Sequence, residues 1–155
     1  MIALDTSIVP AFIDKARRHP NKIFARFNGV PVTFGEIDRR SSALAAALRR
    51  AGLARGDRAA VMLHSSVDSL TLLFGLARAG VVWVPVNVQL RADGLRYILE
   101  HCDPRAIFVE AELAGVVAES GADIAGIPRM RLLPDRQHLI AVGESFRIPP
   151  QSVGR

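Results

Sequence analysis

Apolar residues recur at spacings of three and four between Thr33 and Gly52, which predicts an amphipathic helix. The first turn is typical of a capping box, because the Thr33 hydroxyl can accept from the Glu36 amide and the Glu36 side chain can accept from the Thr33 amide. At the other end, Gly52 suits the left-handed position that closes a helix, and Leu53 suits the apolar contact that follows. The sequence therefore specifies both ends of this helix.

Two short apolar runs, 58–63 and 81–84, do not alternate with polar residues. Each is expected to be a strand buried on both faces, as in a parallel sheet. Between them, residues 66–79 are apolar nearly all round, which predicts a helix covered by other structure. Pro85 should stop the second strand, since proline cannot donate to a ladder.

The remaining elements complete an alternation of strands and helices. Asn28-Gly29 is a two-residue turn signal and predicts an N-terminal β-hairpin. Strand, helix and strand in succession favour right-handed crossovers. We therefore predict an α/β fold with an open, mainly parallel sheet, flanking helices and an N-terminal hairpin. The other predicted segments are helices at 7–19, 93–101 and 110–119 and strands at 22–27, 30–33 and 106–109.

Residues 121–155 differ from the rest of the chain, because proline and glycine punctuate them and no helical period survives. Short strands are predicted there at 129–133 and 138–142. We expect residues 1–120 to form one subdomain and residues 121–155 to be a poorly ordered tail.

Charge and cysteine content exclude several classes of protein. The net charge is +5, but the arginine pairs fall on different predicted helices and the aromatic residues on core positions, which favours solvated helix faces over a nucleic-acid site. Cys102 is the sole cysteine, so no internal disulfide can form. The sequence shows no signal peptide and no apolar run of the ~20 residues that a membrane span needs. We expect a cytoplasmic protein without a membrane span.

The search for catalytic machinery is mostly negative. The four histidines have no metal-ligand spacing. His101, Cys102 and Asp103 are adjacent on a predicted helix, so their side chains point about 100° apart and should mark a frayed helix end. Gly56 is expected to be a turn residue, because the charge of the following Asp57 repels phosphate.

Two residues follow predicted strands at the edge where open parallel sheets bind ligands. His64 and Asn87 are therefore candidates for lining a cavity in the complete protein. The alternatives are that His64 caps the next helix or faces solvent, and that Asn87 forms a turn with its own backbone.

Three blocks occur in a characteristic order, namely Val32–Asp38, Leu53–Leu63 and Gly75–Asn87. Together they resemble the N-terminal region of the adenylate-forming (AMP-binding) enzymes, in particular the acyl-CoA synthetase or fatty-acid–CoA ligase type, over roughly residues 7–120. The resemblance implies part of the large N-terminal domain of such a ligase. One departure is visible, because Arg91 and Gly94 stand where the family has a Ser/Thr-x-x-Glu capping box.

The resemblance also implies an activity for the full-length family. Its members activate a carboxylic acid with ATP to an acyl-adenylate and usually pass the acyl group to coenzyme A, which implies ATP, Mg and CoA and a role in fatty acid metabolism. The phosphate loop and the C-terminal domain lie downstream of the matched region, and no position here matches them. We therefore expect a fragment that is inactive alone, with no catalytic, cofactor-binding or metal residue of its own.

Two alternatives stay open. The chain can be one half of a split ligase, with a partner chain supplying the missing C-terminal part, or a non-catalytic binding module. Since covering elements are missing, we expect self-association through an exposed part of the Leu70–Leu76 surface or through a sheet edge near 106–109.

Overall fold

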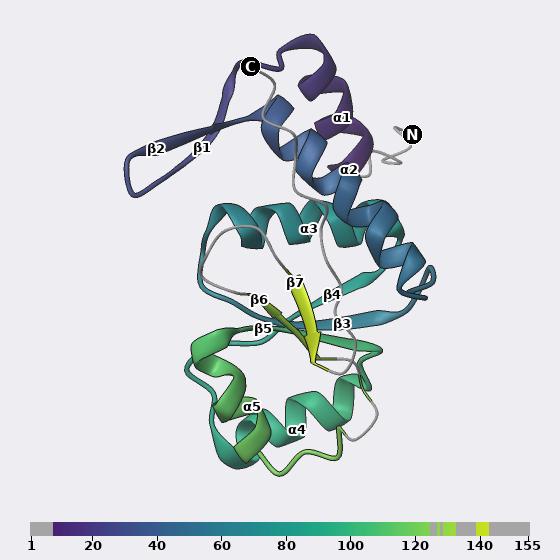
Figure 1. Ribbon diagram of the computed structural model, residues 1–155, viewed down its shortest axis with the longest axis vertical. Helices are drawn as coiled ribbons and strands as arrows, with labels where there is room; N and C mark the ends of the chain where they lie inside the picture. Colours follow the sequence, from purple (N-terminus) through teal and green to yellow (C-terminus); the bar gives the residue numbers. More distant parts are fainter. Residues whose placement is uncertain (1–7, 125–126, 128, 133–138, 143–155) are drawn as a thin grey trace, which may run out of the picture.

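A central sheet lies between two groups of helices in a computed structural model (Figure 1). One face is covered by α3 (Val67–Ala79), with α2 (Phe34–Arg50) and α1 (Ile8–Arg18) beyond it. The other face is covered by α4 (Ala92–Cys102) and α5 (Ala114–Glu119). These layers confirm the predicted α/β class. The structure describes residues 8–124, 127, 129–132 and 139–142.

The sheet contains β3 (Arg58–Met62), β4 (Val82–Pro85), β5 (Ala106–Glu110), β6 (Arg129–Leu132) and β7 (Leu139–Val142). Its strand order is β4-β3-β5-β6-β7, with β7 antiparallel to β6 and all other neighbours parallel. The predicted open, mainly parallel sheet is confirmed. Both strands expected beyond residue 120 belong to this sheet. That residues 121–155 as a whole are poorly ordered stays a prediction.

Two expectations about the sheet were wrong. Residues 106–109 are not an edge, because β5 lies between β3 and β6 and these four residues are fully buried. Among the described strands, the two at the edges are β4 and β7. In β4, Val82 is 48% exposed, so the run 81–84 is not buried on both faces. An apolar run predicts a buried strand, but it does not indicate which strands lie beside it. Here β3 lies between β4 and β5, which leaves β4 at the edge and β5 inside the sheet.

The N-terminal hairpin forms as predicted. Strands β1 (Ile23–Phe27) and β2 (Val30–Thr33) pair antiparallel as a separate two-stranded sheet. Asn28 and Gly29 both have positive φ, at 50° and 81°, which is the conformation that a type I′ turn requires. Figure 1 shows the hairpin projecting from the helical layer near α2.

The ends of α2 agree with the sequence, with one exception. The Gly52 amide donates to Arg49 (3.0 Å) and the Leu53 amide to Leu48 (3.1 Å), which together form a Schellman motif. At the start, the Thr33 hydroxyl accepts from the Glu36 amide at 3.2 Å. Within residues 8–124 the reciprocal bond is missing, because Glu36 turns toward Arg40.

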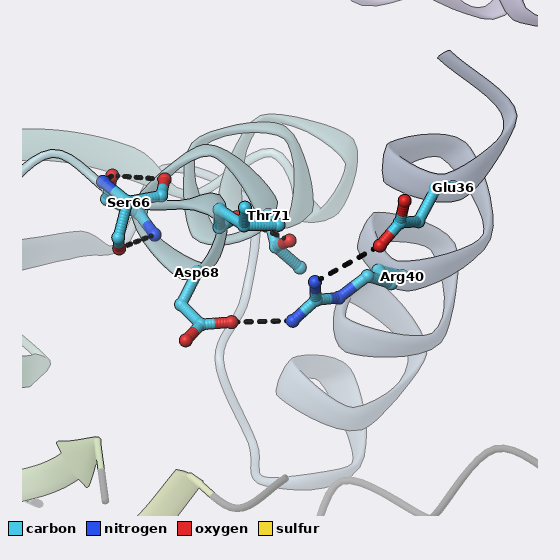
Figure 2. Close-up of polar contacts among 7 residues, drawn as sticks. Glu36, Arg40, Ser66, Asp68 and Thr71 are labelled. Atoms are coloured by element: carbon cyan, nitrogen blue, oxygen red, sulfur yellow. Dashed lines mark hydrogen bonds and ion pairs between the residues drawn. The ribbon is translucent and has the colours of Figure 1, made fainter. Parts of the chain in front are cut away.

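Helix α3 is held against α2 by close packing and by ion pairs. Leu72 and Leu76 are buried, and Leu70 and Leu73 are half-buried beside an aromatic cluster, so little of this surface is exposed. Arg40 of α2 pairs with Asp68 in the first turn of α3 at 2.5 Å and also contacts Glu36 of its own helix. Figure 2 shows Arg40 between these two carboxylates. The predicted cover of this apolar helix is therefore supplied by the chain itself, and the expectation that part of the Leu70–Leu76 surface is exposed was wrong. The cluster consists of Phe12, Phe24, Phe34 and Phe74.

Helix α4 begins without a side-chain cap. Arg91 has extended N-cap geometry but makes no side-chain hydrogen bond to the helix amides, and the following Ala92 has a φ of 43°. The departure seen in the sequence, Arg91 and Gly94 in place of a capping box, thus leaves this helix start without a side-chain cap. None of the helices described has the length and apolarity needed to cross a membrane.

Candidate functional site

Polar side chains gather at the carboxyl ends of the parallel strands. His64 lies two residues beyond β3, and Glu110 is the last residue of the neighbouring β5. One oxygen of Glu110 accepts from the His64 amide at 2.9 Å, and the other lies 2.5 Å from His64 Nδ1. A single carboxylate therefore holds both the backbone and the ring of a residue 46 positions away.

The charge of Glu110 also changes the acidity of His64. The hydrogen bond that the Glu110 carboxylate accepts, and then its charge, raise the pKa of His64 above its ordinary value, and Glu112 adds a smaller effect in the same direction. Desolvation acts the other way but is outweighed. The arrangement therefore favours the imidazolium form of His64.

The structure separates the two residues that the sequence offered as cavity lining. The Asn87 side chain is exposed, and its Oδ1 accepts from the Gln89 amide at 2.9 Å, which is the turn-forming role of the alternative interpretation. His64 does not cap α3, because Ser66 does so in a capping box with Ser69. A cavity-lining role for His64 or Asn87 stays a prediction.

The sequence interpretation missed Glu110 and Glu112. Glu110 directly follows the predicted strand 106–109, and the carboxyl ends of parallel strands share one edge of the sheet. That position was the available signal, and the same reasoning that selected His64 applies to it. Glu112 comes from η1 (Ala111–Leu113), the short 3-10 helix that follows.

The triplet at the end of α4 is not a catalytic group. The Asp103 carboxylate pairs with Arg58 at 2.9 Å, whereas the His101 ring stacks on Tyr97 with centroids 5.4 Å apart. Burial raises the pKa of the Cys102 thiol, which disfavours the nucleophilic thiolate. The three side chains serve different contacts, as their spacing predicted.

The glycine turn before β3 uses its polar groups internally. The Gly56 amide donates to the Gly80 carbonyl at 2.9 Å, and the Ala54 amide donates to the Asp57 carboxylate at 2.8 Å. Gly56 has a φ of 90°, so the turn needs glycine for its conformation. A phosphate at this turn would be repelled by the Asp57 carboxylate, and the Gly56 and Ala54 amides already donate within the chain. Both facts support the interpretation as a turn.

Comparison with known proteins decides the family. A sequence model described as AMP-binding enzyme matches residues 12–145. The chain belongs to the AMP-binding enzyme family. The matched region includes β6 and β7, so it runs past residue 120, while the division at that residue stays a prediction.

Curated relatives include ligases and transport proteins. The fatty acid–[acyl-carrier-protein] ligase ScoC of Streptomyces coeruleorubidus is 34% identical over 131 residues, covering 84% of this chain and 23% of the relative. The 4-hydroxybenzoate–CoA/benzoate–CoA ligase of Rhodopseudomonas palustris is 33% identical, covering 74% and 20%. Mouse long-chain fatty acid transport protein 6 is 32% identical, covering 73% and 18%. The chain spans about a fifth of the length of these relatives.

Solved structures share the fold. The structure of VinN with 3-methylaspartate has a TM-score of 0.72 and 27% identity, covering 80% of this chain and 34% of that one. A benzoate CoA ligase from Burkholderia xenovorans LB400 has a TM-score of 0.70 and 22% identity, covering 81% and 25%. At that identity the second likeness concerns the fold alone.

Proposed function

We propose that this chain forms the first part of an ATP-dependent acid–thiol ligase and supplies scaffold rather than chemistry. The observation that carries the proposal is the family match over residues 12–145. The Gly56 turn agrees with a scaffold role, because its amides are satisfied within the chain. In the complete enzyme, a carboxylic acid would be adenylated with ATP and Mg and then transferred to CoA or another thiol in the cytoplasm. The names of the relatives favour a fatty or aromatic acid.

The chain alone is expected to lack adenylation activity. Stabilising the charge of a reacting phosphate needs preorganised donors and a cation, usually a lysine or Mg²⁺. The only two lysines are Lys15, which lies in α1, and Lys22, which precedes the hairpin. Neither adjoins a glycine-rich loop, so neither matches that requirement.

A second chain is the alternative source of the ligase chemistry. Strand β4 supports this idea, because among the described strands it pairs only with β3 and leaves Val82 exposed. Such an edge can accept a strand from a partner or from a second copy of this chain.

A chimera tests the scaffold role. Residues 12–145 would replace the corresponding segment of the Rhodopseudomonas palustris ligase, and benzoate-dependent ATP–pyrophosphate exchange would be measured. We expect exchange by the chimera, and none by the isolated chain or by the ligase with that segment deleted. Leu44→Asp in the chimera is the matched control, since a charge at this buried position should abolish both folding and exchange.

Two results would contradict the proposal. Exchange by the isolated chain, at a rate that follows its concentration through successive purification steps, would show that it carries its own chemistry. A folded chimera that lacks exchange would show that this segment does not serve as a ligase scaffold.

A further inference from the structure

Three side chains of metal-binding type converge at the carboxyl edge of the sheet. A ring nitrogen of His64 and carboxylate oxygens of Glu110 and Glu112 all lie within 4.8 Å of one another. They come from two segments, the loop after β3 and the turn from β5 into η1. The register of the sheet brings these segments together, because Met62 lies opposite Val109.

Two of the three groups are already oriented. The Glu110 side chain is only 20% exposed, and its Oε1 is fixed by the His64 amide at 2.9 Å. This bond leaves Oε2 directed at His64 Nδ1. Outer hydrogen bonds of this kind hold a ligating carboxylate in place before a metal arrives. Because β5 lies inside the sheet, the carboxylate also stands on a rigid support.

The donor set selects a class of ion. Two carboxylates beside a neutral imidazole carry a charge of −2, which a divalent cation balances. One nitrogen and two oxygen donors suit zinc and similar transition metals, whereas magnesium prefers oxygen ligands and retains its water. The His64 side chain is 56% exposed, so water can complete the coordination shell.

We propose that His64, Glu110 and Glu112 bind a divalent transition-metal ion such as Zn²⁺. Metal–ligand bonds of about 2.1 Å in a tetrahedron separate the ligand atoms by about 3.4 Å. The His64 Nδ1 and Glu110 Oε2 atoms, now 2.5 Å apart, must therefore separate by about 1 Å. In this step the metal takes the place of the proton that the two atoms share, and that proton is released. The site is independent of the ligase scaffold role.

Zinc titration of the 155-residue chain, followed by calorimetry against a competing chelator, tests the site. We expect one equivalent of Zn²⁺, bound at least tenfold more weakly by each of His64→Gln and Glu112→Gln. Glu112 is exposed in a short helix, so its substitution should leave the fold intact. Bound Co²⁺ should show visible absorption, and excess Mg²⁺ should not displace Zn²⁺. Matched controls that should bind Zn²⁺ like the parent are His19→Gln, His101→Gln, His138→Gln and Glu119→Gln.

Three outcomes would overturn the proposal. The first is an absence of stoichiometric Zn²⁺ binding by the parent chain. The second is equal affinity in the parent and in Glu112→Gln, which would reduce the cluster to an ion pair between His64 and Glu110. The third is displacement of Zn²⁺ by Mg²⁺ at similar concentrations, which would indicate a site of oxygen ligands only. Far-UV circular dichroism of each variant confirms that a lost affinity does not come from unfolding.

Discussion

Through its side chain, Glu110 connects the end of β5 to the loop that follows β3. Its two oxygens contact the amide and the ring of His64, so movement of the loop after β3 would break both bonds at once. The carboxylate is mostly buried while the imidazole is half-exposed. The pair therefore acts on the chain mainly by fixing the position of the loop and by favouring a charged His64.

We expect His64 to titrate above the ordinary histidine pKa, because Glu110 stabilises the imidazolium by a hydrogen bond and by its charge. Glu110→Gln should lower this pKa more than Glu112→Gln does. NMR titration of the ring protons in the presence of a chelator measures both shifts. A pKa that stays unchanged in Glu110→Gln would contradict the geometry.

The same shift predicts how stability depends on pH. Because the pKa of His64 is raised in the folded state, its contribution to stability is fully present below the unfolded value of about 6.5. That contribution is lost as the pH rises through the higher, folded-state pKa. The difference in urea midpoint between the parent and Glu110→Gln should therefore shrink from pH 6 to pH 9.

The contact between α2 and α3 depends on one glycine. A Cβ placed on Gly75 would lie 2.6 Å from Leu44 Cδ2 and 2.8 Å from Leu44 Cγ. Leu44 is fully buried, so it has little room to move away. The two helices approach this closely only because position 75 has no side chain.

Gly75→Ala should therefore destabilise the chain by about 1–3 kcal/mol, the usual cost of overpacking a core. Gly94→Ala is the matched control, since its Cβ would meet Leu90 at an ordinary 3.4 Å and glycine is costly within a helix. It should stabilise the chain by about 0.5–1 kcal/mol. Urea unfolding of both variants measures these changes in the free energy of unfolding. Equal changes at the two positions would contradict the close packing of α2 and α3 at Gly75.

The helices and strands could be predicted from the sequence because nearby residues determine where each of them begins and ends. A left-handed glycine at position 52 and a turn at Asn28 each need only nearby residues. The bond expected of Glu36 is missing because its side chain turns toward Arg40, four residues further along the same helix, which also pairs with Asp68 of α3. An i,i+4 ion pair and a capping box can both use Glu36, and the sequence does not say which of the two forms.

The arrangement of the strands was less accessible to sequence reasoning. The parallel class follows from the apolar runs and their helical crossovers, but the place of each strand does not. For the same reason the sequence selected His64 and missed Glu110, because the contact between them depends on β3 and β5 being neighbours. Asn87 follows β4, on the opposite side of β3 from β5, and its side chain makes a local turn instead.

Hydrogen exchange can test the observed strand order. Among the described strands, β4 pairs only with β3, so only alternate amides of its chain point that way. The Val82 amide donates to the Asp57 carbonyl at 2.7 Å and the Val86 amide to the Val61 carbonyl at 2.9 Å. The amide of Trp83 should face the open edge, and Pro85 has none. In contrast, β3 and β5 lie inside the sheet and are paired on both sides.

We therefore expect slow exchange in β3 and β5 and distinctly faster exchange at Trp83, measured by NMR at low protein concentration. Equal protection of the runs 58–63 and 81–84, as the apolar pattern alone predicts, would contradict an open β4 edge. Protection of Trp83 that appears only as the concentration rises would instead show that a second copy of the chain pairs with β4. That result would support self-association through this edge.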